Sequence, residues 1–145
     1  MAIEIQTKTG VRLVRKTADQ SVADTTLVSD TDLKISVLAG EIWAFFACLR
    51  YDAGATPDIK FGWSFPAGTT MSWGKYSIDS IESIETDILL ESGTTGSIRY
   101  ITYKGVIIVG SSAGAVILRW AQNVLDAGDP TIVKVNSYII AYKIN

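Results

Sequence analysis

The stretch that decides the fold is Glu41-Ile-Trp-Ala-Phe-Phe-Ala-Cys-Leu-Arg-Tyr51, followed across Asp52-Ala-Gly-Ala-Thr-Pro57 by Asp58-Ile-Lys-Phe-Gly-Trp-Ser-Phe65. The first run is apolar at both alternating sets of positions, which is typical of a strand covered on both faces. The second run alternates between apolar residues and smaller or polar ones, as expected for a strand with one wet face. We therefore predict two long antiparallel strands, joined by a short Gly/Pro loop, at the centre of a β-sandwich.

The rest of the chain repeats this kind of pattern. Short apolar runs bounded by turn-forming residues predict further strands at residues 11–16, 25–28, 33–37, 69–73, 97–109, 115–122, 131–135 and 137–144. The strand at 97–109 should bend at Gly105, and the loop 110–114 should join it to 115–122 as a hairpin. Turn signals at short intervals predict an all-β, antiparallel β-sandwich or jelly-roll-like fold.

Residues 74–92 form the exception to the strand pattern. Four isoleucines, Ile78, Ile81, Ile84 and Ile88, recur at spacings of three and four, as on one face of a helix. Isoleucine is a weak helix former, so the same residues could also decorate strands. The fold prediction therefore includes one short helix or an irregular crossover in this segment.

Size and composition indicate one domain with an apolar excess. A chain of 145 residues can bury about 68–70% of the surface that its unfolded form exposes. We divide it into an N-terminal arm or edge strand, residues 1–16, and a β-sandwich domain, residues 17–145. Hydrophobic residues make up 48% and charged residues 19%. Two interpretations stay open: a well-filled β core, or a surface covered by another subunit.

Charge and hydrophobic pattern argue against nucleic acid and membrane as partners, and the cysteine content bears on the compartment. The net charge of −2 and pI of about 5.0 provide no basic field for nucleic acid. The start of the sequence has no basic region followed by an apolar run, and the charge-free stretch 105–118 is too short to span a bilayer. The single cysteine, Cys48, is expected to be a buried structural thiol, which fits assembly in a reducing cytoplasm.

The residue types offer little catalytic chemistry. There is no histidine, which removes the commonest general base, the usual triads and most zinc sites. A glycosidase would need two carboxylates held across a sugar. The candidates are Asp30 and Asp32 at a strand entrance and, in the ambiguous segment, Glu82, Glu85, Asp87 and Glu91, but such carboxylates are usually solvated. Asp30-x-Asp32 and Asp126-x-x-Asp129 could bind calcium, but both lack the twelve-residue calcium loop, so turn capping is favoured. We expect no enzyme, no catalytic residue, no metal and no cofactor.

Four residues are candidates for contact with a partner. Arg12, Arg15 and Lys16 form the only local basic cluster. They indicate either a solvated edge strand protected from mispairing by its charges or an arm that docks on an acidic partner. Trp73 lies at a predicted strand end before Gly74, so we expect it at a surface or interface. The other three tryptophans alternate with polar neighbours and are expected in the core: Trp43, Trp63 and Trp120.

Three segments of the chain resemble small virion proteins of tailed bacteriophages. They are Arg15-Lys-Thr-Ala-Asp-Gln-Ser-Val22 with Thr25–Leu33 and Gly40–Phe45, then Thr56-Pro-Asp-Ile-Lys-Phe61 with Phe65-Pro-Ala-Gly68, and lastly Ser112–Asn123 with Ser137–Tyr142. The resemblance implies a β-sandwich protein of the particle. It would be either a decoration (cement) protein on the capsid or a tail-fibre or head-fibre module that binds a receptor or carbohydrate.

Between these two, the sequence favours decoration, since it contains no collagen-like or coiled-coil stalk. The resemblance then implies a homotrimer that contacts the major capsid protein at the virion surface, with neither nucleic acid nor membrane as a partner. Inner faces of three subunits could cover the apolar excess. The arm with Arg12, Arg15 and Lys16 would tether the protein to the capsid or to a neighbouring copy.

Overall fold

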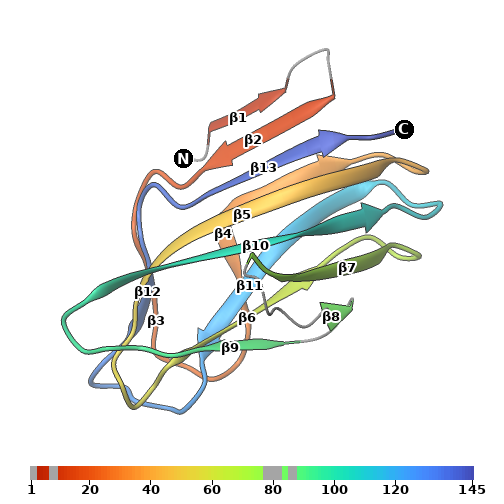
Figure 1. Ribbon diagram of the computed structural model, residues 1–145. Helices are drawn as coiled ribbons and strands as arrows, with labels where there is room; N and C mark the ends of the chain where they lie inside the picture. The colour runs from red at the N-terminus through yellow and green to blue at the C-terminus, as the bar shows by residue number, and fades with distance from the viewer. Residues whose placement is uncertain (1–2, 7–9, 77–82, 85–87) are drawn as a thin grey trace.

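The computed structural model describes residues 3–6, 10–76, 83–84 and 88–145, and it shows two antiparallel sheets packed face to face (Figure 1). This confirms the prediction of an all-β sandwich. The described part of the chain contains no helix, and none of it could cross a membrane as a helix. Within 74–92 its only elements are strands, so the predicted short helix is not found there; residues 77–82 and 85–87 lie outside the described part.

The larger sheet carries most of the strands. Its main order is β1 (Ile3–Gln6), β2 (Val11–Arg15), β13 (Tyr138–Lys143), β5 (Ile42–Asp52), β10 (Ile98–Ile108), β7 (Thr70–Lys75) and β8 (Ser83–Ile84). At one end β12 (Thr131–Val133) pairs with both β5 and β3 (Gln20–Val22). The predicted arm thus contains β2, an internal strand of this sheet, and β1, which lies at its edge.

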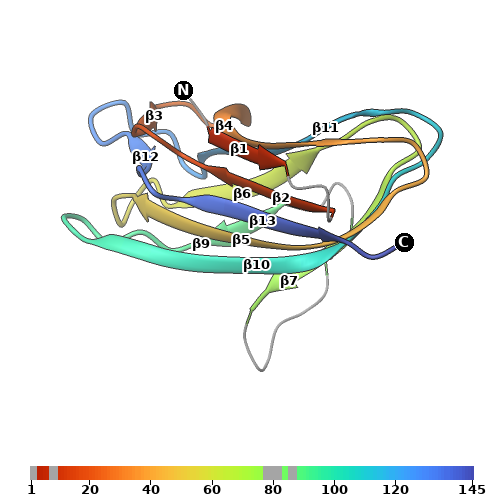
Figure 2. The ribbon, with the colours of Figure 1, turned by 90° about the horizontal axis from the view of Figure 1, so that it is seen from above.

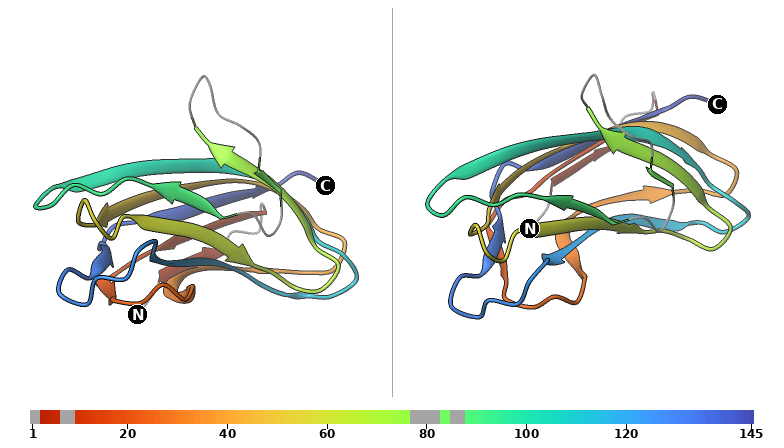
Figure 3. Two further views of the ribbon diagram at one scale, coloured as in Figure 1. Left: turned by 90° about the horizontal axis from the view of Figure 1, so that it is seen from below. Right: turned by 60° about the horizontal axis from the view of Figure 1, so that its bottom comes forward.

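The smaller sheet covers one face of the larger one (Figures 2 and 3). Its order is β4 (Val28–Val37), β11 (Gly114–Gln122), β6 (Ile59–Ser64) and β9 (Leu89–Glu91). Inward residues of both sheets meet in one core. Its aromatic rings contact one another edge to face, with centroids 5.3 Å apart for Phe45 and Trp63 and 5.1 Å for Trp73 and Tyr103. Trp43, Trp63 and Trp120 lie in this core as predicted.

The predicted pairing of the two central strands is wrong. β5 pairs with β10 and β13, whereas β6 pairs with β11 and β9 in the opposite sheet. The predicted hairpin of 97–109 with 115–122 fails in the same way, because β10 and β11 also lie in different sheets. The physical reason is burial: neighbours in one sheet turn their apolar faces to the same side and need a second layer, while strands in opposite sheets cover each other.

The turn after β5 shows how the chain changes sheet. Asp58 has a φ of 48°, and its carboxylate accepts a 2.7 Å hydrogen bond from the Gly93 N–H. The loop is therefore held by the segment after β9 and does not fold back on β5. Gly105, where a bend was predicted, lies within the unbroken strand β10; a Cβ there would lie 2.1 Å from the Ser72 carbonyl oxygen of β7. Close strand approach is what requires glycine at this position.

Candidate functional site

The two faces of β5 differ in exposure. The inward side chains, from Trp43 to Tyr51, are buried, with at most 3% of their surface exposed. The outward side chains are only partly covered, and Phe46 is 37% exposed. The expectation of a strand covered on both faces is therefore wrong for the single chain: no third layer of described residues lies over this outer face (Figure 2).

Neighbouring strands extend the apolar character of this face. In β13, Tyr138 and Tyr142 lie opposite Cys48 and Ala44, and in β10, Ile108 lies opposite Ile42. Tyr76 follows β7 and packs its ring edge to face against Phe46, with centroids 6.0 Å apart. We call the following exposed residues the outer patch: Phe46, Tyr76, Tyr100, Ile108, Tyr138 and Tyr142.

Cations lie among these rings. The Lys104 ammonium lies 4.9 Å from the Tyr76 ring centroid, and the Arg50 guanidinium lies 5.6 Å from that of Tyr100. Both distances fit cation–π contacts. Arg15 is the register partner of Tyr138 at the β2 side of the patch. The outer patch is therefore apolar and aromatic, with positive charge within and beside it.

Cys48 lies on this outer face and not in the core. The thiol is half-buried, and the Thr102 hydroxyl donates to its sulfur at 3.5 Å. The expectation of a buried core thiol is wrong because Cys48 has the outward parity of β5. A hydrogen bond with Cys48, the electrostatic interaction between the two groups and partial burial raise the pKa of Tyr138 above its ordinary value.

The four predicted partner-binding residues do not come together. Trp73 is 2% exposed and packs against Trp63 and Tyr103, so its expected surface position is wrong. The strand β7 continues to Lys75, and the parity of Trp73 directs its ring into the sandwich. Gly74, which indicated a strand end, is an interior residue of that strand.

The basic cluster is divided among three environments. Lys16 is fully buried, which contradicts an exposed contact role. Arg12 is half-buried: its guanidinium lies 5.0 Å from the Trp43 ring centroid, and its Nε–H donates to the Ser36 carbonyl oxygen of the opposite sheet at 3.4 Å. Arg15 alone among the four is exposed, and it donates to the Asn136 amide oxygen at 2.5 Å.

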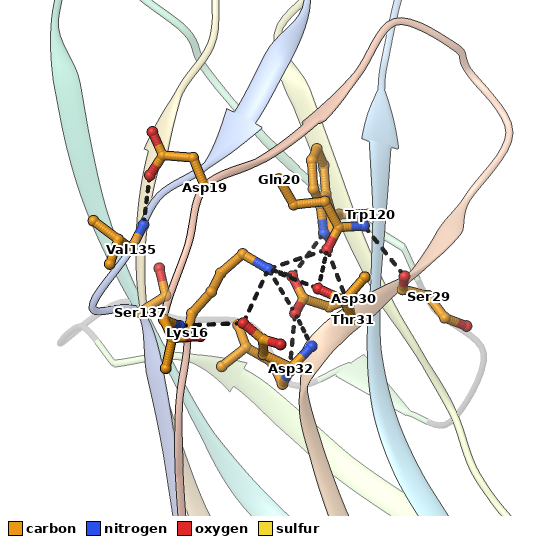
Figure 4. Close-up of polar contacts among 12 residues, drawn as sticks. Lys16, Asp19, Gln20, Ser29, Asp30, Thr31, Asp32, Trp120, Val135 and Ser137 are labelled. Atoms are coloured by element: carbon orange, nitrogen blue, oxygen red, sulfur yellow. Dashed lines mark hydrogen bonds and ion pairs between the residues drawn. The ribbon is translucent and has the colours of Figure 1, made fainter. Parts of the chain in front are cut away.

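A buried polar cluster surrounds Lys16 (Figure 4). The Lys16 Nζ lies 3.0 Å from each carboxylate oxygen of Asp30 and 3.0 Å from the Gln20 Oε1, which accept its hydrogen bonds. Asp32 Oδ2 is 4.0 Å from the same nitrogen. We call the following residues the Lys16 cluster: Lys16, Gln20, Asp30, Asp32 and Trp120. Sequence reasoning expected both carboxylates to be solvated, but Asp30 and Asp32 are 2% and 7% exposed.

Fixed donors hold the Asp30 carboxylate in place. Its Oδ1 accepts hydrogen bonds of 2.9 Å from the backbone N–H groups of Asp32 and Leu33, and its Oδ2 accepts one of 3.1 Å from the Trp120 indole. Asp30 thus caps backbone groups, as the capping interpretation predicted. Asp126 does so too, accepting from the Gly128 N–H at 3.0 Å. Among the described residues no three potential ligands gather in a way that could hold a metal ion.

The two features differ in how visible they are in the sequence. The outer patch has a signal in the sequence, because the first central run is apolar at both parities and the last strand places Tyr138, Ile140 and Tyr142 on one face. The Lys16 cluster has no such signal: Lys16 follows a strand, residues 11–15, that carries two arginines, and no local pattern distinguishes it from Arg15.

Comparisons with known proteins identify no family. No family model matches the chain, and no curated protein matches it. Among solved structures, it is similar to a family 16 carbohydrate-binding module-2, with 10% identity and a TM-score of 0.38 over 88% of this chain and 75% of that chain. It is also similar to the Eiger TNF from S. frugiperda, with 14% identity and a TM-score of 0.43 over 99% of this chain and 91% of that one. A third likeness is to infectious bursal disease virus, Gx strain: 11% identity and a TM-score of 0.23, covering 99% of this chain and 46% of that one.

Proposed function

We propose that the chain is a non-enzymatic virion structural protein that decorates the outside of a tailed-phage capsid as a homotrimer and stabilises it. The observation that supports this proposal is the outer patch. Monomeric proteins rarely leave a contiguous apolar surface of this kind uncovered, and such surfaces usually mark interaction sites. Aromatic residues and arginine are also the residue types that dominate interface energetics.

The patch suits contact between copies of the same chain. It carries exposed tyrosine rings together with Arg15, Arg50 and Lys104, so one copy can offer cations to the rings of the next. Closed symmetry would let every copy bury the same surface. This arrangement covers the outward face of β5, which the chain alone leaves open, and accounts for its apolar sequence at both parities.

The first test is the mass of the purified protein in solution, by sedimentation equilibrium. We expect a trimer for the natural sequence and a monomer for Phe46→Arg, which places a charge at the centre of the patch. Leu125→Arg is the matched control: Leu125 is also exposed, at 63%, but lies in the loop after β11. A monomeric natural protein, or equal association of both variants, would contradict the contact between copies.

The second test addresses the capsid. Added to heads that lack it, the protein should raise the melting temperature of the capsid in proportion to occupancy. Labelled antibody should decorate the whole head. A label confined to the tail tip or to a few fibres would overturn decoration.

A second candidate function is a fibre module that binds a receptor or carbohydrate. It is favoured by Tyr100, which is 72% exposed beyond the centre of the outer patch, where a ring could stack on a sugar. Binding to a glycan array that is lost in Tyr100→Ala, in a protein that does not bind heads, would support this candidate over decoration.

A further inference from the structure

We propose that Lys16 and Asp30 join in an intramolecular isopeptide bond, formed by the folded chain without a cofactor. The inference concerns the covalent structure of the protein and does not depend on the proposed function. It rests on the Lys16 cluster, in which a buried amine meets a buried carboxyl group that is held by donors on both oxygens (Figure 4).

The reacting atoms are in contact. Lys16 Nζ is 3.0 Å from both oxygens of Asp30, so the carboxyl carbon between them lies within the about 3–3.5 Å that separates reacting atoms in near-attack geometries. Both side chains have no exposed surface. The fold therefore supplies the proximity that would otherwise limit amide formation between two side chains, and it excludes bulk water from the site.

The donors around Asp30 match the charge that develops during attack. Oδ1 faces the backbone N–H groups of Asp32 and Leu33, both at 2.9 Å, which is the arrangement of an oxyanion hole. Oδ2 accepts from the Trp120 indole N–H at 3.1 Å and is the oxygen that leaves. The two oxygens of one carboxyl group thus have different surroundings.

The step balances without another reactant. The Lys16 ammonium transfers one proton to Asp30 Oδ2, and the resulting amine lone pair attacks the carboxyl carbon to form the C–N bond. Asp32, whose Oδ2 is 4.0 Å from Nζ, accepts a second proton from the attacking nitrogen and passes it to the Asp30 Oδ2. The C–O bond breaks, Oδ2 leaves as water, Oδ1 remains as the amide carbonyl oxygen, and Asp32 returns to its starting state.

The bond would staple the two layers of the sandwich. Lys16 directly follows β2 of the larger sheet, and Asp30 belongs to β4 of the smaller sheet. The bond would close a loop of residues 16–30, and Gln20 lies within that loop. Gln20 Oε1 accepts a hydrogen bond from Lys16 Nζ and another, of 2.9 Å, from the Thr31 N–H, so it holds the amine against the backbone of β4.

Intact-mass measurement of the purified, denatured full chain tests the bond. We expect a mass lower by one water molecule than the sequence requires. Trypsin then locates the link, because residues 17–33 contain no lysine or arginine. A linked Lys16 resists cleavage, so the expected peptide spans residues 16–34 and lacks one water. The full sequence mass, or release of an unmodified 17–34 peptide as the main product, would overturn the proposal.

Variants separate the bond from other losses of water. Lys16→Ala and Asp30→Ala should restore the full mass, and Asp32→Asn should slow or abolish closure while both reacting groups remain. A succinimide at Asp30 would also lose water, but it would leave cleavage after Lys16 intact and persist in Lys16→Ala, which would overturn the proposal. Asp19→Ala is the matched control: it removes the carboxylate of the exposed ion pair between Lys134 and Asp19, and it should keep the mass deficit.

Discussion

Two lysine–aspartate pairs on one segment, Lys16–Asp30 and Lys134–Asp19, have the same chemistry in opposite environments. Lys16 and Asp19 both belong to the connection between β2 and β3. Lys16 turns inward and its pair with Asp30 has no exposed surface, whereas the side chains of Lys134 and Asp19 are 19% and 42% exposed. Burial changes what each pair can do, because a buried charge has no water to replace a lost partner.

Removing one partner of the buried pair should destabilise the protein more than any other change proposed here. Without Lys16, the Asp30 carboxylate stays in the core with its cation missing, and such losses cost about 3–5 kcal/mol. We expect Lys16→Ala to lower the free energy of unfolding by more than that amount, measured by urea denaturation, because the variant also lacks the isopeptide bond. The double variant Lys16→Met, Asp30→Leu removes both charges and should be destabilised less than Lys16→Ala. A larger loss in the double variant would contradict the burial argument.

The indole donor should have an intermediate effect. Trp120→Phe keeps a ring in the core but removes the 3.1 Å hydrogen bond to Asp30 Oδ2. Hydrogen bonds to charged groups contribute about 1.5–3 kcal/mol. In a chain that has not closed, as in the Asp32→Asn background, Trp120→Phe should therefore lower the free energy of unfolding, measured by urea denaturation, by at least that amount, since the smaller ring also packs less well. Trp43→Phe is a control, because its indole N–H donates at 3.1 Å to Glu41, outside the Lys16 cluster. If isopeptide closure slows in Trp43→Phe as much as in Trp120→Phe, the assigned role of Trp120 is wrong.

The exposed pair should contribute little. Asp19→Ala removes the ion pair with Lys134 and the 2.7 Å hydrogen bond from the Val135 N–H. Exposed pairs contribute about 0.2–1 kcal/mol and weaken with salt, so the loss should be within that range and shrink at high ionic strength. A loss comparable to that of Lys16→Ala would remove the distinction between the two pairs.

Acid should remove the stabilising contribution of the exposed Lys134–Asp19 pair. The hydrogen bond from Lys134, then that from Val135, lowers the pKa of Asp19 below its ordinary value of 3.8. Because the folded pKa is depressed, this contribution is present above the ordinary value and is lost as pH falls through the folded value. In urea denaturation series, the stability difference between the natural protein and Asp19→Ala should therefore close below about pH 4. A difference that grows on acidification would contradict the sign of the shift.

The strands were predictable because their pattern is local. Alternation in residues 42–52, 59–64 and 138–143 reports which side chains share a face, and that information is carried by the side chains themselves. Which strand pairs with which is decided elsewhere. The loops after β5 and β10 looked like hairpin turns, but each carries the chain to the opposite sheet, since the apolar faces on either side must cover one another.

The candidate sites divide in the same way. The apolar excess left two interpretations open, a well-filled core or a surface covered by another subunit. The strand that is apolar at both parities has one buried face, and the outer patch lies on its other, partly exposed face. Trp73 was misplaced because glycine indicated a strand end that β7 does not have. Lys16 and Asp30 could not be paired in advance, since their contact depends on how β2 and β4 stack across the sandwich.

The sequence by itself determined that this protein is built of strands, which residues of each strand share a face, and that its hydrophobic fraction is high. Tertiary structure alone decided the pairing of strands, the exposure of the outer patch and the meeting of Lys16 with Asp30. The physical reason is range: alternation acts between residues next to each other, whereas burial and contact depend on segments that only folding brings together.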